Sequence, residues 1–326
     1  MLKYFFQRML LLIPMVIVIS LLAFIGLELT PGDPLTAMLS PDQMSSMTTE
    51  ELDAMRESLG LNDPMLIRYG RWVINLLKGD LGISVMSGSP IKDIIKNLLP
   101  ATIILTMVAL VVSTLIGLIL GIFAAIKQNS IVDYLSSVLG VLGISIPQFF
   151  IGILAILFFA VRLQWFPAQG RTDIGLNFWQ SLKYLVLPSF SLGITLTAAL
   201  MRHTRNSMLD VLNKDYVKTA RAKGLPEWKV YTFHVFRNAM MPISVMILLR
   251  LPMLIGGAVV IEQVFGYAGI GNRLLTAINA SDYQLVLIII LLLSIVALFA
   301  SVLIDLFTAV LDPRVRLGSS KNQGGA

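Results

Sequence analysis

Six stretches of this sequence are apolar over about 20 residues or more, and they constrain the fold more than any other feature. A helix needs roughly 20 mostly apolar residues to cross the hydrocarbon core of a bilayer. The stretches lie at about residues 9–29, 101–126, 135–161, 184–203, 239–261 and 283–310. Because only helices and closed barrels satisfy their backbone groups in lipid, these lengths predict an all-α polytopic membrane protein with six transmembrane helices.

The first stretch must be told apart from a removable secretory signal. It follows Lys3 and Arg8, as a signal does. Its apolar core is too long for a signal, however, and no cleavage site of small residues follows it. We therefore interpret it as a retained membrane anchor.

The composition excludes several kinds of site. Charged residues make up 13% of the chain, whereas soluble domains carry about 25%. Cys is absent and only two His are present, His203 and His234, so disulfides, thiolate chemistry and a His-rich metal site are not expected. The sequence contains no GxxxxGK[ST] phosphate loop, GxSxG or HExxH motif. We therefore expect a chain that is not an enzyme and has no catalytic residue, cofactor or metal of its own.

The positions of Lys and Arg predict the orientation, because basic residues accumulate on the cytoplasmic side. With the N-terminus inside, the inside segments 1–8, 127–134, 202–238 and 311–326 hold 14 basic and five acidic residues. The outside segments then hold 10 basic and 12 acidic residues. This asymmetry predicts N-in, C-in topology. The positive net charge of +6 then reflects topology and membrane lipid, and no nucleic-acid partner is expected.

The predicted topology divides the chain into four parts. They are an N-terminal tail and first helix at 1–30, an extracytoplasmic loop or cap at 31–99, a membrane core at 100–311 that includes the loop 204–238, and a cytoplasmic tail at 312–326. Within the cap, Thr followed by Glu50 and Glu51 predicts a helix start, and Leu52, Met55 and Leu59 give that helix one apolar face. A small folded cap is favoured over an unstructured connector.

Residues 214–238, KDYVKTARAKGLPEWKVYTFHVFRN, form a compact basic element between two apolar stretches. Gly224 is a natural helix stop, and Pro226 suits the first turn of a second helix. The sequence therefore predicts a helix, a sharp turn and a second helix at the inner membrane surface.

Helical spacing places Tyr216, Ala220 and Gly224 on one face of the first of these helices, with Val217 beside them. Lys214, Lys218 and Arg221 line another face. An anchor in the lipid headgroups would explain the basic residues but not the small ones, which allow another surface to come close. We therefore interpret the small-residue stripe as the contact face of a protein-docking helix, with a lipid anchor as the alternative.

Three ionisable residues lie within the apolar stretches and are functional candidates for that reason. Glu28 lies at the outer end of the first stretch and Asp305 near the inner end of the last, where packing or hydrogen bonding is expected. Arg250 lies in mid-span. It either pairs with an acid on a partner chain, faces a cargo path and meets a carboxylate, or reaches the lipid surface.

Two further features concern helix shape and packing. Pro147 is predicted to kink the third span, because proline removes a backbone hydrogen bond and clashes with the preceding turn. Gly117 and Gly121 form a GxxxG spacing, which indicates close packing against another helix of this chain or of a partner.

The basic loop, DYVKTARAKGL…HVFRNAMMP, resembles the cytoplasmic loop of ATP-binding-cassette import permeases of the peptide and nickel branch. The stretches RMLLLIPMVIVISLLAFIGLELTPGDPL, GDLGIS, LPSFSLG, EQVFGYAGIGNRLLTAI and DLFTAVLDPRVRL agree with that branch, in order and over nearly the whole chain. The first loop resembles that of the first of the two permease chains in peptide systems.

The resemblance implies a type I importer subunit in a bacterial or archaeal cytoplasmic membrane. Its partners would be a second homologous permease chain, two ATP-binding subunits that hold ATP and Mg²⁺, and an extracytoplasmic substrate-binding protein. The ATP-binding subunits would dock on a coupling helix between the fourth and fifth spans. Its docking residues would be Tyr216, Val217, Ala220, Arg221, Ala222 and Gly224.

The sequence departs from the family pattern at a few positions. Lys218 begins the segment where the broad family has Glu-Ala-Ala, and Ala268 stands where relatives commonly have Pro. Arg250 replaces a usual Gln and Pro252 a usual Gly in the fifth span, where they bear on the cargo path.

The leading hypothesis is a permease subunit that imports short peptides, with glutathione or nickel as alternatives within the class. An ion-coupled secondary transporter would show inverted repeats and a midplane acid pair, whereas Glu28 and Asp305 lie toward opposite faces. A membrane scaffold would keep the docking loop without needing a pore. Pro147 and Arg250 are the candidates for the cargo path or the contact between permeases.

Overall fold

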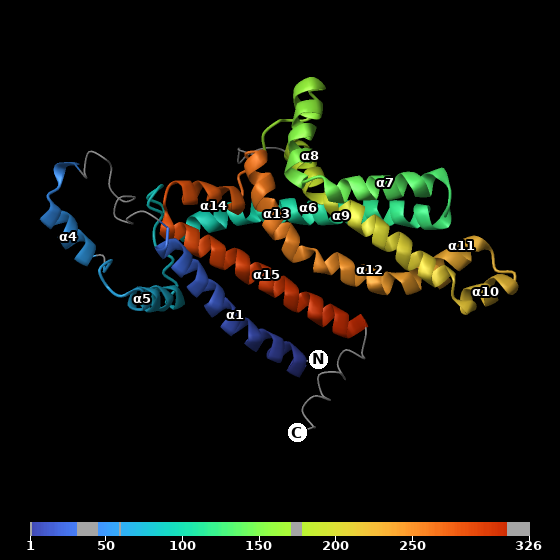
Figure 1. Cartoon of the computed structure of the whole chain (residues 1–326), viewed down its shortest axis with the longest axis horizontal. Helices are drawn as coiled ribbons and strands as arrows, with labels where there is room; N and C mark the ends of the chain where they lie inside the picture. Colours follow the sequence, from blue (N-terminus) through green and yellow to red (C-terminus); the bar gives the residue numbers. More distant parts are fainter. Residues whose placement is uncertain (1, 31–44, 59, 171–177, 312–326) are drawn as a thin grey trace.

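A computed structural model of the chain describes residues 2–30, 45–58, 60–170 and 178–311. Within these ranges the helices are joined by turns and loops, and the one β-feature is an isolated bridge between Ile83 and Pro90 (Figure 1). The elements are α1 (Leu2–Glu28), α4 (Thr49–Ser58), α5 (Met65–Leu77), α6 (Ile91–Ile126), α7 (Ile131–Ser145), α8 (Gln148–Ala155), the π-helical η1 (Ile156–Arg162), α9 (Phe178–Leu212), α10 (Asp215–Ala222), α11 (Glu227–Lys229), the π-helical η2 (Val230–Phe236), α12 (Arg237–Leu249), α13 (Leu251–Val264), α14 (Ile270–Asn279) and α15 (Tyr283–Leu311). The predicted all-α fold is confirmed.

The described residues contain five helices long and apolar enough to cross a membrane, or six if the bent pair formed by α7 with α8 and η1 is one span. Five of the six predicted stretches lie in these helices, and the fifth, 239–261, continues from the span Glu227–Leu249 into the shorter apolar helix Leu251–Val264. Three helices extend beyond the predicted stretches: α1 begins at Leu2, α6 begins at Ile91 and α9 ends at Leu212. Helices α6 and α9 continue through charged residues, such as Lys92 and Arg205, that a count of apolar residues excludes.

Two predicted spans are not straight helices. The third bends by 102° between Ser145 and Gln148, which confirms the predicted kink at Pro147. The fifth, predicted as one span at 239–261, is two helices that break at Arg250, and this corrects the prediction. Pro252 lies in the first turn of α13, where its missing N–H would have no helical partner in any case.

Helix α9 is the centre of the bundle and lies between α6, α7 and α12 (Figure 1). The GxxxG glycines of α6 face it: a Cβ on Gly117 would lie 3.1 Å from the Thr197 carbonyl oxygen, and one on Gly121 would lie 2.6 Å from that of Met201. Glycines of α7 also meet α9, since a Cβ on Gly143 would lie 2.8 Å from the Ala198 side chain. The predicted close packing is confirmed, and its partner is a helix of this chain.

Helix α1 lies along α15 at the edge of the bundle (Figure 1). An ion pair of 2.9 Å joins Arg8 to Asp305 near one end of the two helices. Glu28 at the other end of α1 pairs with Arg68 of α5. The bonding role expected for Asp305 is therefore observed, and Glu28 likewise forms an ion pair at the end of its helix.

The segment between α1 and α6 is attached to the bundle at the start of α15. The buried carboxylate of Asp282 accepts a hydrogen bond of 2.6 Å from Ser84 Oγ and one of 3.2 Å from the Met86 backbone. Gln284 Nε2 donates to the Leu81 carbonyl oxygen at 3.0 Å. These bonds hold the GDLGIS segment against the turn before α15.

The predicted helix start in the cap is confirmed by a capping box. The Thr48 N–H donates to Glu51 Oε2 at 2.8 Å, and the Glu51 N–H donates to Thr48 Oγ1 at 3.3 Å. The Thr48 backbone bond lowers the pKa of the exposed Glu51 carboxyl. Leu59, the last residue of the predicted apolar face, lies outside the described residues.

The contact between α6 and α9 predicts that adding one methyl group at Gly121 destabilises the bundle. We expect Gly121→Ala to lower the melting temperature of the purified protein in detergent, because overpacking costs about 1–3 kcal/mol. Gly26→Ala in α1 is the matched control, since a Cβ there meets nothing within 4 Å. It should leave the melting temperature unchanged or raise it. Equal effects of the two substitutions would show that α6 and α9 do not pack as closely as described.

Candidate functional site

The basic loop folds as the predicted helix, turn and helix at the end of the molecule opposite α4 and α5 (Figure 1). Helix α10 ends in a turn whose centre is Gly224, with φ +75°. The Gly224 N–H donates to the Arg221 carbonyl oxygen at 2.9 Å. This left-handed conformation favours glycine, so the predicted helix stop is confirmed.

One buried cluster attaches this loop to the membrane helices. Val217 and Ala220 of α10 are fully or almost fully buried. They pack in a cluster with Val230 and Val235 of η2, Leu200 and Met208 of α9, Ala125 of α6, and Ala239 and Ile243 of α12. The loop is therefore part of the core formed by α6, α9 and α12.

The structure divides the six docking residues predicted from the sequence into two groups. Val217 and Ala220 face the interior of this chain, so the small side chain of Ala220 permits close packing of its own neighbours. The other four, Tyr216, Arg221, Ala222 and Gly224, are exposed. Tyr216 is 45% exposed, and a Cβ at Gly224 would meet nothing within 4 Å. The surface available to a partner is thus narrower than the predicted stripe.

Ion pairs stiffen α10 and its turn. Arg221 donates from Nε and Nη2 to the two carboxylate oxygens of Glu227, at 2.9 and 3.2 Å, and so bridges the turn. This hydrogen bonding raises the pKa of Arg221. Lys218 Nζ lies 2.9 Å from Asp215 Oδ1 and lowers the pKa of that carboxyl. Both are exposed pairs, which contribute little to stability individually.

The sequence reasoning missed an aromatic pair on this loop. Trp228 and Phe233 are both exposed, and their ring centroids lie 6.5 Å apart. The Lys229 ammonium lies 5.5 Å from the centre of the Trp228 ring. The sequence signal that could have revealed this pair is the presence of Trp228 and Phe233 within the charged segment 214–238. His234 is adjacent to Phe233, and its carbonyl oxygen accepts a bond of 2.7 Å from Asn238.

Arg250 and Pro147, the candidates for the cargo path, both lie at helix breaks. Arg250 is half-buried, and its guanidinium contacts Met253 Sδ at 3.5 Å; no acid among the described residues forms an ion pair with it. Pro147 precedes α8, and the following Gln148 lies against α13, where its amide would be 2.6 Å from a Cβ on Gly257. The residue that follows the break at Pro147 therefore packs against α13, the helix that follows Arg250.

A buried carboxylate explains the EQVFGYAGIGN segment, which sequence reasoning left without a structural role. Glu262 is fully buried at the end of α13. Its Oε1 accepts a bond of 2.5 Å from Thr102 Oγ1 of α6, and its Oε2 accepts one of 2.9 Å from the Asn272 N–H at the start of α14. A Cβ on Gly269 would collide with this carboxylate. Glu262 thus joins α6, α13 and α14.

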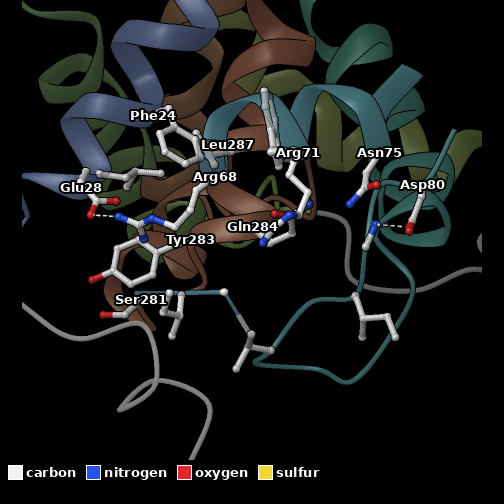
Figure 2. A pocket seen from close by; sticks show the side chains of 17 residues that line it. Phe24, Glu28, Arg68, Arg71, Asn75, Asp80, Ser281, Tyr283, Gln284 and Leu287 are labelled. Carbon is white, nitrogen blue, oxygen red and sulfur yellow. Dashed lines mark hydrogen bonds and ion pairs between the residues drawn. The ribbon is translucent and has the colours of Figure 1, made fainter. Parts of the chain in front are cut away.

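A cavity of 640 Å³ lies at the other end of the molecule, between α1, α5, the 80–85 segment and the start of α15 (Figure 2). Arg68, Arg71 and Asn75 point into it from α5 (Figure 2). Several of its polar groups are already paired within the chain, including Arg68 with Glu28. Because the cavity lies at the end of the molecule opposite the basic loop, the two are separate surfaces.

Comparison with known protein families identifies the family of this chain. The family model described as "Binding-protein-dependent transport system inner membrane component" matches residues 117–317, which include the basic loop and the Glu262 segment. A companion model for the N-terminal part of the same membrane component matches residues 1–106. The chain belongs to the family of binding-protein-dependent transport system inner membrane components.

Individual members of this family are similar over almost their whole length. A Brucella suis biovar 1 (strain 1330) protein named as a peptide permease protein is 37% identical over 320 residues, which cover 97% of this chain and 100% of the relative. An oligopeptide transport system permease protein of Bacillus subtilis (strain 168) is 33% identical over 315 residues, 96% of this chain and 98% of the relative. A glutathione transport system permease protein of Escherichia coli (strain K12) is 35% identical over 316 residues, 97% and 99%.

The family settles the class of this protein. It is a multi-pass membrane protein and a permease subunit of an ATP-binding-cassette importer of the peptide and nickel branch. Subunits of this kind do not have an ATPase site of their own.

Proposed function

We propose that this chain is the membrane-spanning permease subunit of an ATP-driven importer for short peptides, and that it forms half of the translocation path. The whole-length similarity to permeases named for peptides and oligopeptides carries the proposal. Glutathione, itself a short peptide, is compatible with the relative named for it and stays the first alternative cargo. Nickel is the second alternative within the branch.

The proposed topology has six spans with both termini in the cytoplasm, in a bacterial or archaeal cytoplasmic membrane. The bent pair formed by α7 with α8 and η1 is then one of the six. Residues 31–99 form the extracytoplasmic cap and residues 204–238 the cytoplasmic loop. The tail at 312–326 lies outside the described residues.

In this function, the exposed part of the loop is the docking surface for a separate ATP-binding subunit, which holds ATP and Mg²⁺. Tyr216, Arg221, Ala222 and Gly224 offer the surface of α10 and its turn. Val217 and Ala220 support that surface from below, because they are packed in the cluster with α9 and α12. A push on α10 is thereby transmitted to the membrane helices. A second permease chain and an extracytoplasmic binding protein complete the proposed complex.

Arg250 and Pro147 are proposed to line the cargo path or the contact with the second permease. Interrupted helices at membrane depth are tolerated only where the backbone is buried in protein or lines a water-filled cavity. A half-buried arginine in a span also needs a partner, and the described residues of this chain provide no acid for it. A carboxylate of the cargo or an acid of the second permease would satisfy Arg250.

Uptake into proteoliposomes tests the proposed function. The chain is reconstituted with its second permease and ATP-binding subunits, and the binding protein is added outside. We expect labelled short peptides to accumulate only with ATP, and no uptake when this chain is omitted. If glutathione is taken up in preference to other short peptides, or if Ni²⁺ is taken up in preference to peptides, that compound is the cargo. Uptake driven by an imposed proton or sodium gradient without ATP would identify a secondary transporter and refute the proposal.

The docking surface is tested with two substitutions of similar size at Gly224. Asn and Asp both tolerate the left-handed conformation better than other side chains, so Gly224→Asn and Gly224→Asp differ mainly in charge. We expect the Asp variant to insert in the membrane but to lose association with the ATP-binding subunits in a pull-down, because an unpaired acid is buried in the contact.

The Asn variant should retain most of that association, and Lys214→Ala, before the start of α10, should retain nearly all of it. If the Asp variant associates as the native chain does and supports uptake, the loop is not docked through Gly224. It would then serve as a lipid anchor.

A further inference from the structure

Helix α5 (Met65–Leu77) has three faces of about equal width. An α-helix turns by roughly 100° per residue, so side chains on each face recur three and four positions apart. The first face packs against the bundle and consists of Tyr69, Trp72, Val73 and Leu76. The second is polar and consists of Arg68, Arg71 and Asn75, which point into the cavity (Figure 2). The third is apolar, consists of Leu66, Ile67, Gly70, Ile74 and Leu77, and contains no charged residue.

The third face is not covered by the described part of the chain. Leu66 is 67% exposed, Ile67 52%, Ile74 53% and Leu77 81%. Trp72, on the packed face of the same helix, is only 8% exposed. Four large apolar side chains on one side of a 13-residue helix therefore face the surroundings of the chain.

The contacts of α5 fix its height along α1. Arg68 pairs with Glu28, the last residue of α1. The Phe24 ring, one turn before Glu28, lies 5.5 Å from the Tyr69 ring and 6.3 Å from that of Trp72. The Tyr69 hydroxyl reaches Ser20 Oγ at 2.8 Å, which is two turns and roughly 12 Å before Glu28 along the helix. Helix α5 therefore lies beside the last turns of a membrane-spanning helix and not beyond its end.

Helix α1 is a candidate membrane span over Phe5–Glu28, and a bilayer around it would place the boundary between the headgroups and the acyl chains near these last turns. Leu22, which lies between Ser20 and Phe24 in the sequence, is 62% exposed, so the lipid-facing surface of α1 extends to the level of α5. Of the three faces of α5, one contacts the bundle and one, with Arg68, Arg71 and Asn75, faces the cavity. The remaining face is apolar and exposed.

We propose that α5 is an interfacial membrane helix. Its face formed by Leu66, Ile67, Ile74 and Leu77 is embedded in the acyl boundary of the leaflet in which α1 ends, and its arginines point into the cavity. An amphipathic helix with a large apolar face and a basic polar face binds at this depth of a bilayer. The cap is thus supported by lipid on the side of α5 away from the bundle. The inference requires only that α1 crosses the membrane, and it holds for any cargo.

Nitroxide labels at single cysteines test this proposal, because the native chain has no Cys. The full chain, assembled with its partner subunits, is placed in vesicles of phosphatidylethanolamine and phosphatidylglycerol. Labels are introduced by Ile74→Cys and Leu77→Cys on the apolar face, by Asn75→Cys on the polar face, and by Leu22→Cys as the lipid-facing reference. Collision rates are measured with oxygen, which concentrates in lipid, and with a water-soluble nickel chelate.

We expect the labels at positions 74 and 77 to collide several-fold more with oxygen than with the chelate, as the label at position 22 does. The label at position 75 should show the opposite preference. If position 74 or 77 is as accessible to the chelate as position 75, the face is exposed to water and the proposal is wrong. If both are shielded from both reagents, a protein subunit covers the face and the proposal is equally wrong.

Discussion

The architecture depends on the close contact of α9 with its neighbours through glycine. At Gly121 there is no room for even one methyl group beside the Met201 carbonyl oxygen, and Gly143 is similarly close to Ala198. Within lipid, helices gain no hydrophobic free energy by associating, so close van der Waals packing through small residues has to hold them together. Helix α9 is accordingly the most buried of the candidate spans, and α6, α7 and α12 are arranged around it.

This arrangement explains how an event at one end of the molecule can reach the membrane helices. The cluster around Val217, Ala220 and Met208 joins α10 to α9, and it includes residues of α6 and α12. At the other end of α6, Thr102 donates to the buried Glu262 carboxylate, which also accepts a bond from the start of α14. Helix α6 thus shares a buried cluster with the basic loop and is hydrogen-bonded to the α13–α14 corner. In the proposed importer, the ATP-binding subunit acts on the first of these contacts.

Much of the fold could be predicted because its signals are local. Span positions follow from runs of apolar residues, the turn at Gly224 follows from helix-stop chemistry, and the kink follows from Pro147. What the sequence could not supply is contact between distant segments. From the sequence alone, Ala220 is predicted to be a docking residue. The structure instead buries it in a cluster with Val230 and Val235. In the sequence, Glu262 marks only the end of an apolar run. Its structural role could not be predicted, because its partner Thr102 lies 160 residues earlier. The break at Arg250 was missed because both halves of the fifth span are equally apolar.

Because Val217 and Ala220 of the basic loop are packed in one buried cluster with α9, the loop and α9 should move as one body in the proposed importer, and a distance measurement between two spin labels tests this most directly. Lys218 on α10 and Phe190 on α9 are both exposed, so Cys can replace each in this cysteine-free chain without disturbing the core. Double electron–electron resonance then gives the distance in the assembled complex, without nucleotide and with ATP trapped. The account predicts one narrow distance that is the same in both states. A shift of the distance between the two states would show that the loop moves relative to α9 and would contradict the account.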